Sequence, residues 1–145
     1  MCLLYAQAGT LGGSPEVLIK AIYANHQPWA HHEIALDRED ELSKYFDKEL
    51  TELFLKEEGC KKATHEICRL EADPIYCQQD FADELKNLRV VPIRKQSNKY
   101  TVSFVNLEKR RLVYSMNKTR VGWRVSDIQC EEGPSLKQQL SRPAD

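Results

Sequence analysis

The sequence lacks the features that identify several large classes of protein. It has no long apolar run, so no segment is expected to span a membrane. It has no excess of either charge, because 21 basic and 22 acidic residues give a net charge of −1. This balance argues against nucleic acid or an anionic membrane as the partner. The chain also has no internal repeat, and its 145 residues suit a single domain.

Catalytic and metal-binding motifs are absent as well. The chain contains no Gly-x-Ser-x-Gly nucleophile elbow, no phosphate-binding glycine-rich loop and no His-Glu-x-x-His motif. Three of the four histidines, His26, His31 and His32, lie close together near Glu33. Adjacent histidines point apart on a helix or a strand, so we interpret these as solvated loop residues. No metal, no cofactor and no catalytic residue is therefore expected.

Cysteine is comparatively abundant, with five residues in the chain. The opening residues include Ala6-Gln7-Ala8, a small-x-small triplet of the kind that ends a secretory signal peptide. Cleavage after Ala8 removes Cys2 and leaves an even set, which in a small exported domain indicates two disulfides. The segment before the triplet is short and has no basic residue. Either upstream residues are missing, or the chain is cytosolic with five separate thiols. The even set is Cys60, Cys68, Cys77 and Cys130.

The pairing that we favour joins Cys60 to Cys68 and Cys77 to Cys130. The first bond closes a local loop, and the second joins the connector before the sheet to the end of the last strand. Four cysteines allow three pairings, so the others stay open. A zinc site is the competing interpretation, but the spacings of 8, 9 and 53 residues match no common zinc finger. Disulfides place the protein in the periplasm or outside the cell.

Helical periodicity dominates the first half of the chain. Ser14 is expected to cap a helix that has Pro15 at its first position and ends before Pro28. A second helical region begins near residue 37, receives a new cap at Asp47 and ends at Gly59. The apolar stripe of the first helix is predicted to contain Val17, Leu18, Ala21 and Ile22.

After Leu85 the periodicity changes from helical to alternating. Turn residues at 97–98, 106–108 and 117–118 separate four apolar segments, and such short links make neighbouring strands antiparallel. Trp123 alternates with Val121 and Val125 and is expected in the core. The predicted strands cover residues 88–95, 100–104, 111–116 and 121–125.

These elements predict an α+β domain. N-terminal helices pack on one face of a curved, four-stranded antiparallel meander, and a short helix capped by Ser135 follows. The domain is expected over residues 14–141. A signal remnant and flexible lead-in occupy 1–13, and a tail occupies 142–145.

Two groups of polar residues are candidates for function. Asp73, Tyr76 and Asp80 cluster around Cys77 and could line a cleft. We favour a structural role, in which the aspartates cap turns, because nothing supplies a nucleophile or metal. The second group lies on the exposed side and turns of the sheet and is expected to contact an acidic surface of a partner protein. It comprises Arg94, Lys99, Lys109, Arg111 and Arg124.

Three motifs, in their order along the chain, resemble those of a known family. The motifs lie at residues 14–23 with 45–50, at 73–80, and at 122–128 followed by Ser135-Leu136. They read SPEVLIKAIY with YFDKEL, DPIYCQQD, and GWRVSDI. Together they resemble a bacterial exported family, domain of unknown function number 3828, with an expected fold like nuclear transport factor 2. The resemblance implies a cone, formed by helices wrapped against a strongly bent sheet.

The leading hypothesis is a non-catalytic binding protein of the cell envelope, an inhibitor or toxin-immunity protein by analogy of fold. The alternative is a small-ligand carrier or an enzyme that uses the cone. Ketosteroid isomerases of that superfamily use the cavity with an acidic base, a constellation that has no matching positions here. A deep apolar pocket that contains a carboxylate with a raised pKa favours the alternative, whereas a cone filled by Trp123, Phe104 and Tyr114 favours a binding protein.

Overall fold

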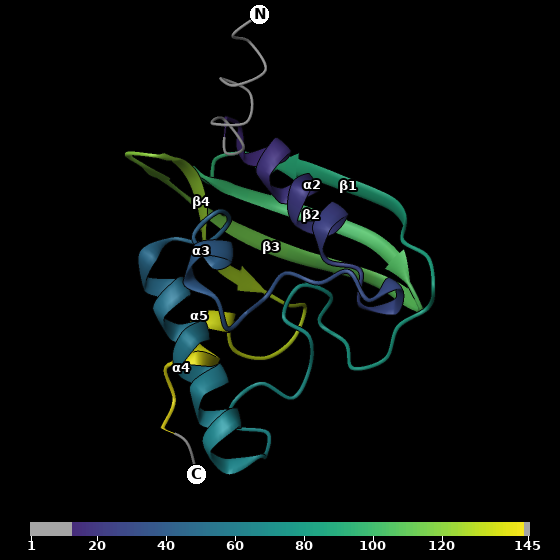
Figure 1. Cartoon of the computed structure of the whole chain (residues 1–145). Helices are drawn as coiled ribbons and strands as arrows, with labels where there is room; N and C mark the ends of the chain where they lie inside the picture. Colours follow the sequence, from purple (N-terminus) through teal and green to yellow (C-terminus); the bar gives the residue numbers. More distant parts are fainter. Residues whose placement is uncertain (1–12, 144–145) are drawn as a thin grey trace, which may run out of the picture.

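The computed structural model describes residues 13–143 (Figure 1). The helices of the first half are α2 (Pro15–Asn25), the short 3-10 helix η1 (Pro28–Ala30), α3 (Glu39–Leu42) and α4 (Lys48–Thr64). They are followed by β1 (Lys86–Pro92), β2 (Lys99–Asn106), β3 (Glu108–Thr119), β4 (Gly122–Gln129) and helix α5 (Leu136–Leu140). The expected signal at residues 1–8 lies outside the described residues. No helix in the described range has the length and apolar character needed to cross a bilayer.

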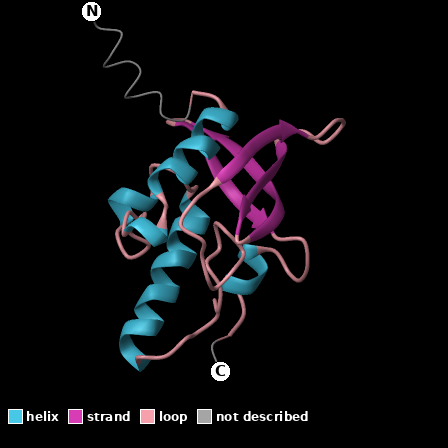
Figure 2. Cartoon of the chain, turned by 90° about the vertical axis from the view of Figure 1, so that its right-hand side faces the viewer, coloured by secondary structure: helices cyan, strands magenta, loops and turns pink. Residues whose placement is uncertain are grey.

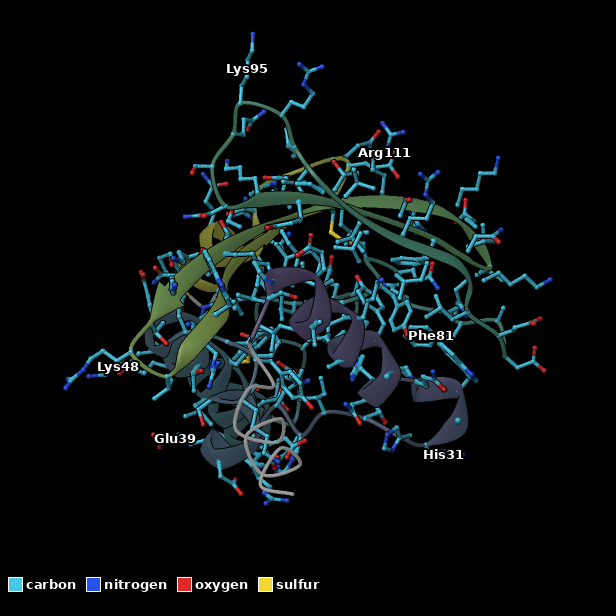
Figure 3. All side chains as sticks on the ribbon, turned by 90° about the horizontal axis from the view of Figure 1, so that it is seen from above. His31, Glu39, Lys48, Phe81, Lys95 and Arg111 are labelled. Atoms are coloured by element: carbon cyan, nitrogen blue, oxygen red, sulfur yellow. A yellow bond between two sulfur atoms is a disulfide. The ribbon has the colours of Figure 1, made fainter. Side chains whose placement is uncertain are left out.

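The four strands form one antiparallel sheet in the order β1-β2-β3-β4. This confirms the predicted meander and the α+β class. The sheet is strongly twisted, and the helices lie to one side of it (Figure 2). In the view from above, α2 packs under the sheet while Lys95 and Arg111 extend from the side away from α2 (Figure 3).

Strand β3 is longer than the sequence predicts. A turn was expected at residues 117–118, but Asn117 pairs with Arg124 and Lys118 with Trp123. The chain reverses after Thr119 instead, whose hydroxyl donates to the Gly122 carbonyl at 2.7 Å. Gly122 has a φ of 118°, a conformation that favours glycine, so the turn forms where this residue is available.

Helix α2 begins as predicted, because the Ser14 hydroxyl accepts the Val17 N–H at 3.1 Å. Its buried face differs from the predicted stripe. Val17 is 53% exposed, whereas Ile19 and Tyr23 are fully buried beside Leu18. The stripe is therefore rotated toward the sheet, where the large Tyr23 ring is needed to fill the concave side.

Helix α4 begins at the predicted cap, since the Asp47 carboxylate accepts the Leu50 N–H at 2.9 Å. It does not end at Gly59. The helix continues to Thr64 and ends where the His65 N–H donates to the Lys61 carbonyl. One glycine inside a helix costs only about 1 kcal/mol, which packing on either side can outweigh.

Aromatic side chains fill the concave side of the sheet. The Tyr23 ring lies 5.4 Å from Tyr76 and 5.3 Å from Phe104, and it lies 6.3 Å from Tyr114. All four residues are buried. Trp123 is only partly buried, although it packs against this core. Its expected neighbour Val121 is exposed, because it belongs to the turn before β4.

The outer edge of β4 is covered by the chain before α4. The Asp47 N–H donates to the Val125 carbonyl, and the Val125 N–H donates to the Tyr45 carbonyl, at 2.9 and 2.8 Å. Helix α5 then contacts both β4 and α4. This arrangement joins the helical and sheet layers at that edge.

Candidate functional site

The two disulfides have the favoured pairing. Cys60 is bonded to Cys68 at the end of α4, and Cys77 is bonded to Cys130 after β4. Crosslinks of this kind form and persist in oxidising compartments. Within residues 13–143, no three His, Cys, Asp or Glu side chains gather as they would around a metal ion.

Asp73 organises a turn and holds His26. Its Oδ1 accepts the N–H groups of Ile75 and Tyr76 at 2.8 and 3.1 Å. Its Oδ2 lies 2.7 Å from Nε2 of His26, whose ring is almost fully buried. His26 Nδ1 accepts the Ile34 N–H at 3.1 Å, so Nε2 carries the proton and donates to Asp73. Both ring nitrogens are therefore used, and neither is free to act as a base.

The other two residues of the predicted cleft do not join Asp73 at an opening. Tyr76 is fully buried, and its hydroxyl donates to the His26 carbonyl at 2.6 Å. Burial, with a smaller contribution from Asp73, raises the pKa of Tyr76 well above its usual range. Asp80 is exposed on the surface. Tyr76 thus belongs to the core, because its ring packs edge-on against Tyr23 and Phe104.

The interior contains no unused polar group in the described residues. No buried side-chain nitrogen or oxygen in this part of the chain lacks a hydrogen-bond partner. Asn106 shows how this is achieved: its amide accepts from Gln78 and from the Ala82 N–H, and it donates to the carbonyls of Ala82 and Glu84. Four bonds from one side chain hold the connector against the end of β2.

An open groove lies on the sheet beside the β2–β3 hairpin, with a volume of about 620 Å³. The strand register explains its lining: Arg89 pairs with Ser103, Ser103 with Arg111, and Val105 with Lys109. These alternate residues share the face that points away from the helices. The register also shifts between Lys86 and Arg89, which interrupts β1 next to the groove. We call this feature the basic groove; its lining includes Arg89, Lys109, Arg110, Arg111 and Glu131.

The five predicted basic residues are not all brought together. Only Lys109 and Arg111 line the basic groove. Lys99 pairs with Ser115, four residues along β3 from Arg111, which corresponds to about 14 Å. Arg94 lies in the turn between β1 and β2.

Arg124 has a structural position instead. Its Nε donates to the Ser43 carbonyl at 2.8 Å, and Nη1 donates to the Trp123 carbonyl at 2.7 Å. Partial burial lowers the pKa of Arg124. Two residues of the groove, Arg89 and Arg110, were not among the predicted ones. The outward alternation of β1 could have identified Arg89, whereas Arg110 points inward and reaches Gln78 at 3.2 Å.

Comparison of the chain with protein-family models, with curated proteins and with solved structures finds no match.

Proposed function

We propose that this protein is a non-catalytic binding protein, which holds an acidic surface of a partner protein in the basic groove. The observation that carries the proposal is the contrast between a filled interior and an open, cationic outer face. Catalysis or carriage inside the cone needs space and a free polar group. Binding at the sheet needs only a rigid surface of suitable charge.

The filled interior supports this proposal over an enzyme or carrier. The Tyr23 and Tyr114 hydroxyls are hydrogen-bonded to each other at 3.0 Å, and Tyr23 donates to the Ile75 carbonyl at 2.7 Å. Their rings, with Phe104, occupy the concave side that an NTF2-like enzyme would use for substrate. The only buried histidine of the described chain, His26, has both nitrogens occupied.

The charge of the basic groove supports an acidic partner. Arg89, Lys109 and Arg111 form no ion pair with another side chain in residues 13–143. Arg110 already pairs with Glu108 at 3.0 Å. Guanidinium groups bind carboxylates through two parallel hydrogen bonds, so free arginines on a rigid strand suit a partner rich in Asp or Glu. The whole protein is nearly neutral, so this attraction is local.

The disulfides and the motif resemblance support a place in the cell envelope. Two disulfides staple this small domain, as is common in exported proteins. The resemblance to an exported family with an NTF2-like fold points to the same compartment. Within that class we propose an inhibitor or immunity protein, because such proteins act by covering a partner.

Titration with a short polyglutamate peptide tests the proposal. Amide shifts in an NMR titration are expected at Arg89, Lys109 and Arg111, with affinity that falls as salt rises. The double variant K109E/R111E should lose on the order of tenfold in affinity. The control variant K20E/K56E carries the same charge change on exposed helical lysines and should bind as the wild type does.

Two results would contradict the proposal. One is equal loss of affinity in the control variant, which would mean that net charge alone matters. The other is shifts confined to the buried residues Tyr23, Tyr76 and Tyr114 on addition of a small apolar compound such as a steroid, which would indicate a carrier or enzyme.

A further inference from the structure

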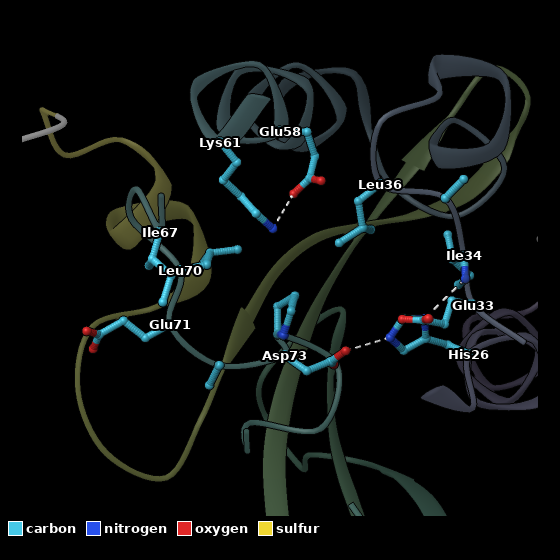
Figure 4. Close-up of a pocket in the computed structure, with 13 residues that line it drawn as sticks. His26, Glu33, Ile34, Leu36, Glu58, Lys61, Ile67, Leu70, Glu71 and Asp73 are labelled. Carbon is cyan, nitrogen blue, oxygen red and sulfur yellow. Dashed lines mark hydrogen bonds and ion pairs between the residues drawn. The ribbon is translucent and has the colours of Figure 1, made fainter. Parts of the chain in front are cut away.

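A second open cleft lies away from the basic groove, between the end of α4, the connector after it and the chain after η1 (Figure 4). Its volume is about 470 Å³, within the range of known ligand sites. Glu58 and Lys61 enter from α4, and Leu36 and Asp73 enter from the other two segments. We call it the acidic cleft.

The acidic cleft carries excess negative charge. Four carboxylates line it, from Glu33, Glu58, Glu71 and Asp73, against the single ammonium of Lys61. Nζ of Lys61 lies 3.1 Å from Oε2 of Glu58, so these two charges are paired. The Asp73 carboxylate is hydrogen-bonded to the His26 ring. The exposed Glu33 and Glu71 form no ion pair with another side chain of the described range. Two carboxylates are thus left for a cationic ligand.

The same cleft offers apolar surface between these charges. Ile67 lines it and is 62% exposed, so its side chain is open to a ligand. Leu70 and Leu36 lie deeper and are partly buried. Apolar surface framed by charge is typical of a site where a protein segment docks. The remaining apolar lining residues are Ile34, Ala35, Ala72 and Pro74.

The walls of the acidic cleft are fixed before any ligand binds. The Cys60–Cys68 disulfide ties the segment that bears Ile67 to the end of α4. Glu57, only 1% exposed, accepts the N–H groups of Arg69 and Leu70, both at 2.8 Å. It also pairs with the Arg69 guanidinium at 3.2 Å. A preformed site loses little conformational entropy on binding, which favours affinity for short ligands.

We propose that the acidic cleft binds a short peptide segment of a partner protein, in which an aliphatic side chain lies next to lysine or arginine. The aliphatic group contacts Ile67, Leu70 and Leu36, and the cation pairs with Glu33 or Glu71, which lie on opposite sides of the cleft (Figure 4). Charge complementarity selects a basic ligand, and the apolar surface selects a peptide over a simple polycation. This inference is independent of the proposed function, since it concerns different residues.

Four probes test the inference by calorimetry and NMR. The first is a short peptide of alternating leucine and lysine, which should bind and shift the signals of Ile67, Leu70 and Leu36. A serine-lysine peptide of equal charge, a leucine-glutamate peptide and spermidine should each bind on the order of tenfold more weakly. Equal binding of the serine-lysine peptide or of spermidine would overturn the proposal, because the apolar surface would then have no role.

Variants locate the binding. E33K/E71K should reduce affinity for the leucine-lysine peptide on the order of tenfold, and I67S should reduce it severalfold. The control E39K/E52K makes the same charge change on exposed glutamates of α3 and α4 outside the cleft and should retain affinity. Circular dichroism shows whether each variant is folded. No binding of the leucine-lysine peptide to the wild type, or equal loss in the control, would also overturn the proposal.

Discussion

At the scale of single residues, hydrogen bonds between buried tyrosine hydroxyls link segments of the core. The Tyr114 hydroxyl donates to the Tyr23 oxygen, and the Tyr23 hydroxyl donates to the Ile75 carbonyl. These two hydrogen bonds join β3, α2 and the connector after Asp73. Since each buried polar atom has a partner, burial of the phenols adds aromatic packing without the penalty of an unpaired group.

Tyr23 lies in the middle of these hydrogen bonds, so removal of its hydroxyl should lower the free energy of unfolding more than removal of the Tyr114 hydroxyl. Tyr23→Phe leaves the Ile75 carbonyl and the Tyr114 hydroxyl without their partner, so it should cost about 1–3 kcal/mol. Tyr114→Phe removes only a donor, because Tyr23 keeps its bond to Ile75, and should cost about 0.5–1.5 kcal/mol. Urea denaturation measures both free energies of unfolding. Equal costs would contradict the predicted difference between the two hydroxyls.

The same tyrosines predict loss of stability at alkaline pH. Burial raises the pKa of Tyr23, Tyr76 and Tyr114 well above the usual value of about 10. As pH rises past about 10, the unfolded chain releases these protons while the folded chain keeps them. The unfolded state then binds fewer protons, so stability is full below pH 10 and falls above it. Denaturant midpoints measured across this range should decrease, with a shallower slope in Tyr114→Phe. A flat profile would contradict the expected direction.

At the scale of elements, the connector between α4 and β1 is held by side chains from its neighbours. Glu57 of α4 fixes Arg69 and Leu70, and Asn106 of β2 fixes Ala82 and Glu84. Such a connector has few backbone partners of its own. Side chains of α4 and β2 therefore fix the path of the connector.

Helix α4 offers a test of local propensity. Gly59 lies inside the helix, and a Cβ built there meets nothing within 4 Å. Gly59→Ala should therefore stabilise the protein by about 0.5–1 kcal/mol, because alanine restricts the unfolded chain and favours the helix. Thermal or urea unfolding measures the gain. Destabilisation would mean that α4 ends near Gly59, as its sequence alone suggests.

The elements show which parts of the structure could be predicted from sequence. Caps at Ser14, Asp47 and Ser135 and the alternation of four strands are local signals, and the structure confirms them. The contact of His26 with Asp73 joins residues 47 positions apart, and no periodicity reports such a pair. Tyr76 is a candidate for a cleft because aspartates lie near it in the sequence, but in the structure the turn made by Asp73 accompanies a Tyr76 ring that is fully buried.

The candidate surfaces also differ in how far local sequence signals could predict them. Lys109 and Arg111 lie on one face of β3, because side chains two positions apart in a strand point the same way. Arg124 of β4 pairs with Asn117, so both positions share this face, but Arg124 bonds to the Ser43 carbonyl, a contact that depends on how the chain after α3 meets β4. The acidic cleft was not predicted, since it forms only where residues 26–36 meet the later segment 58–74.

At the scale of the whole molecule, charge is separated although the net charge is −1. The basic groove lies on the sheet, and the acidic cleft lies among α4, its connector and the chain after η1. Near-neutral net charge gives little long-range steering, so each surface acts only at short range. The two surfaces are formed by different residues, so a variant of one leaves the lining of the other unchanged.

The two disulfides stabilise the molecule to different extents, because they close loops of different length. Cys77 and Cys130 are 53 residues apart, and Cys60 and Cys68 are 8 apart. Loop-closure entropy predicts losses of about 4 kcal/mol for Cys77→Ser with Cys130→Ser, and about 2.5 kcal/mol for Cys60→Ser with Cys68→Ser. Urea denaturation of the two double variants measures both losses, and peptide mapping without reductant checks the remaining bond in each. A larger loss from the short loop would mean that its bond acts mainly in the folded state, by holding the segment that carries Ile67.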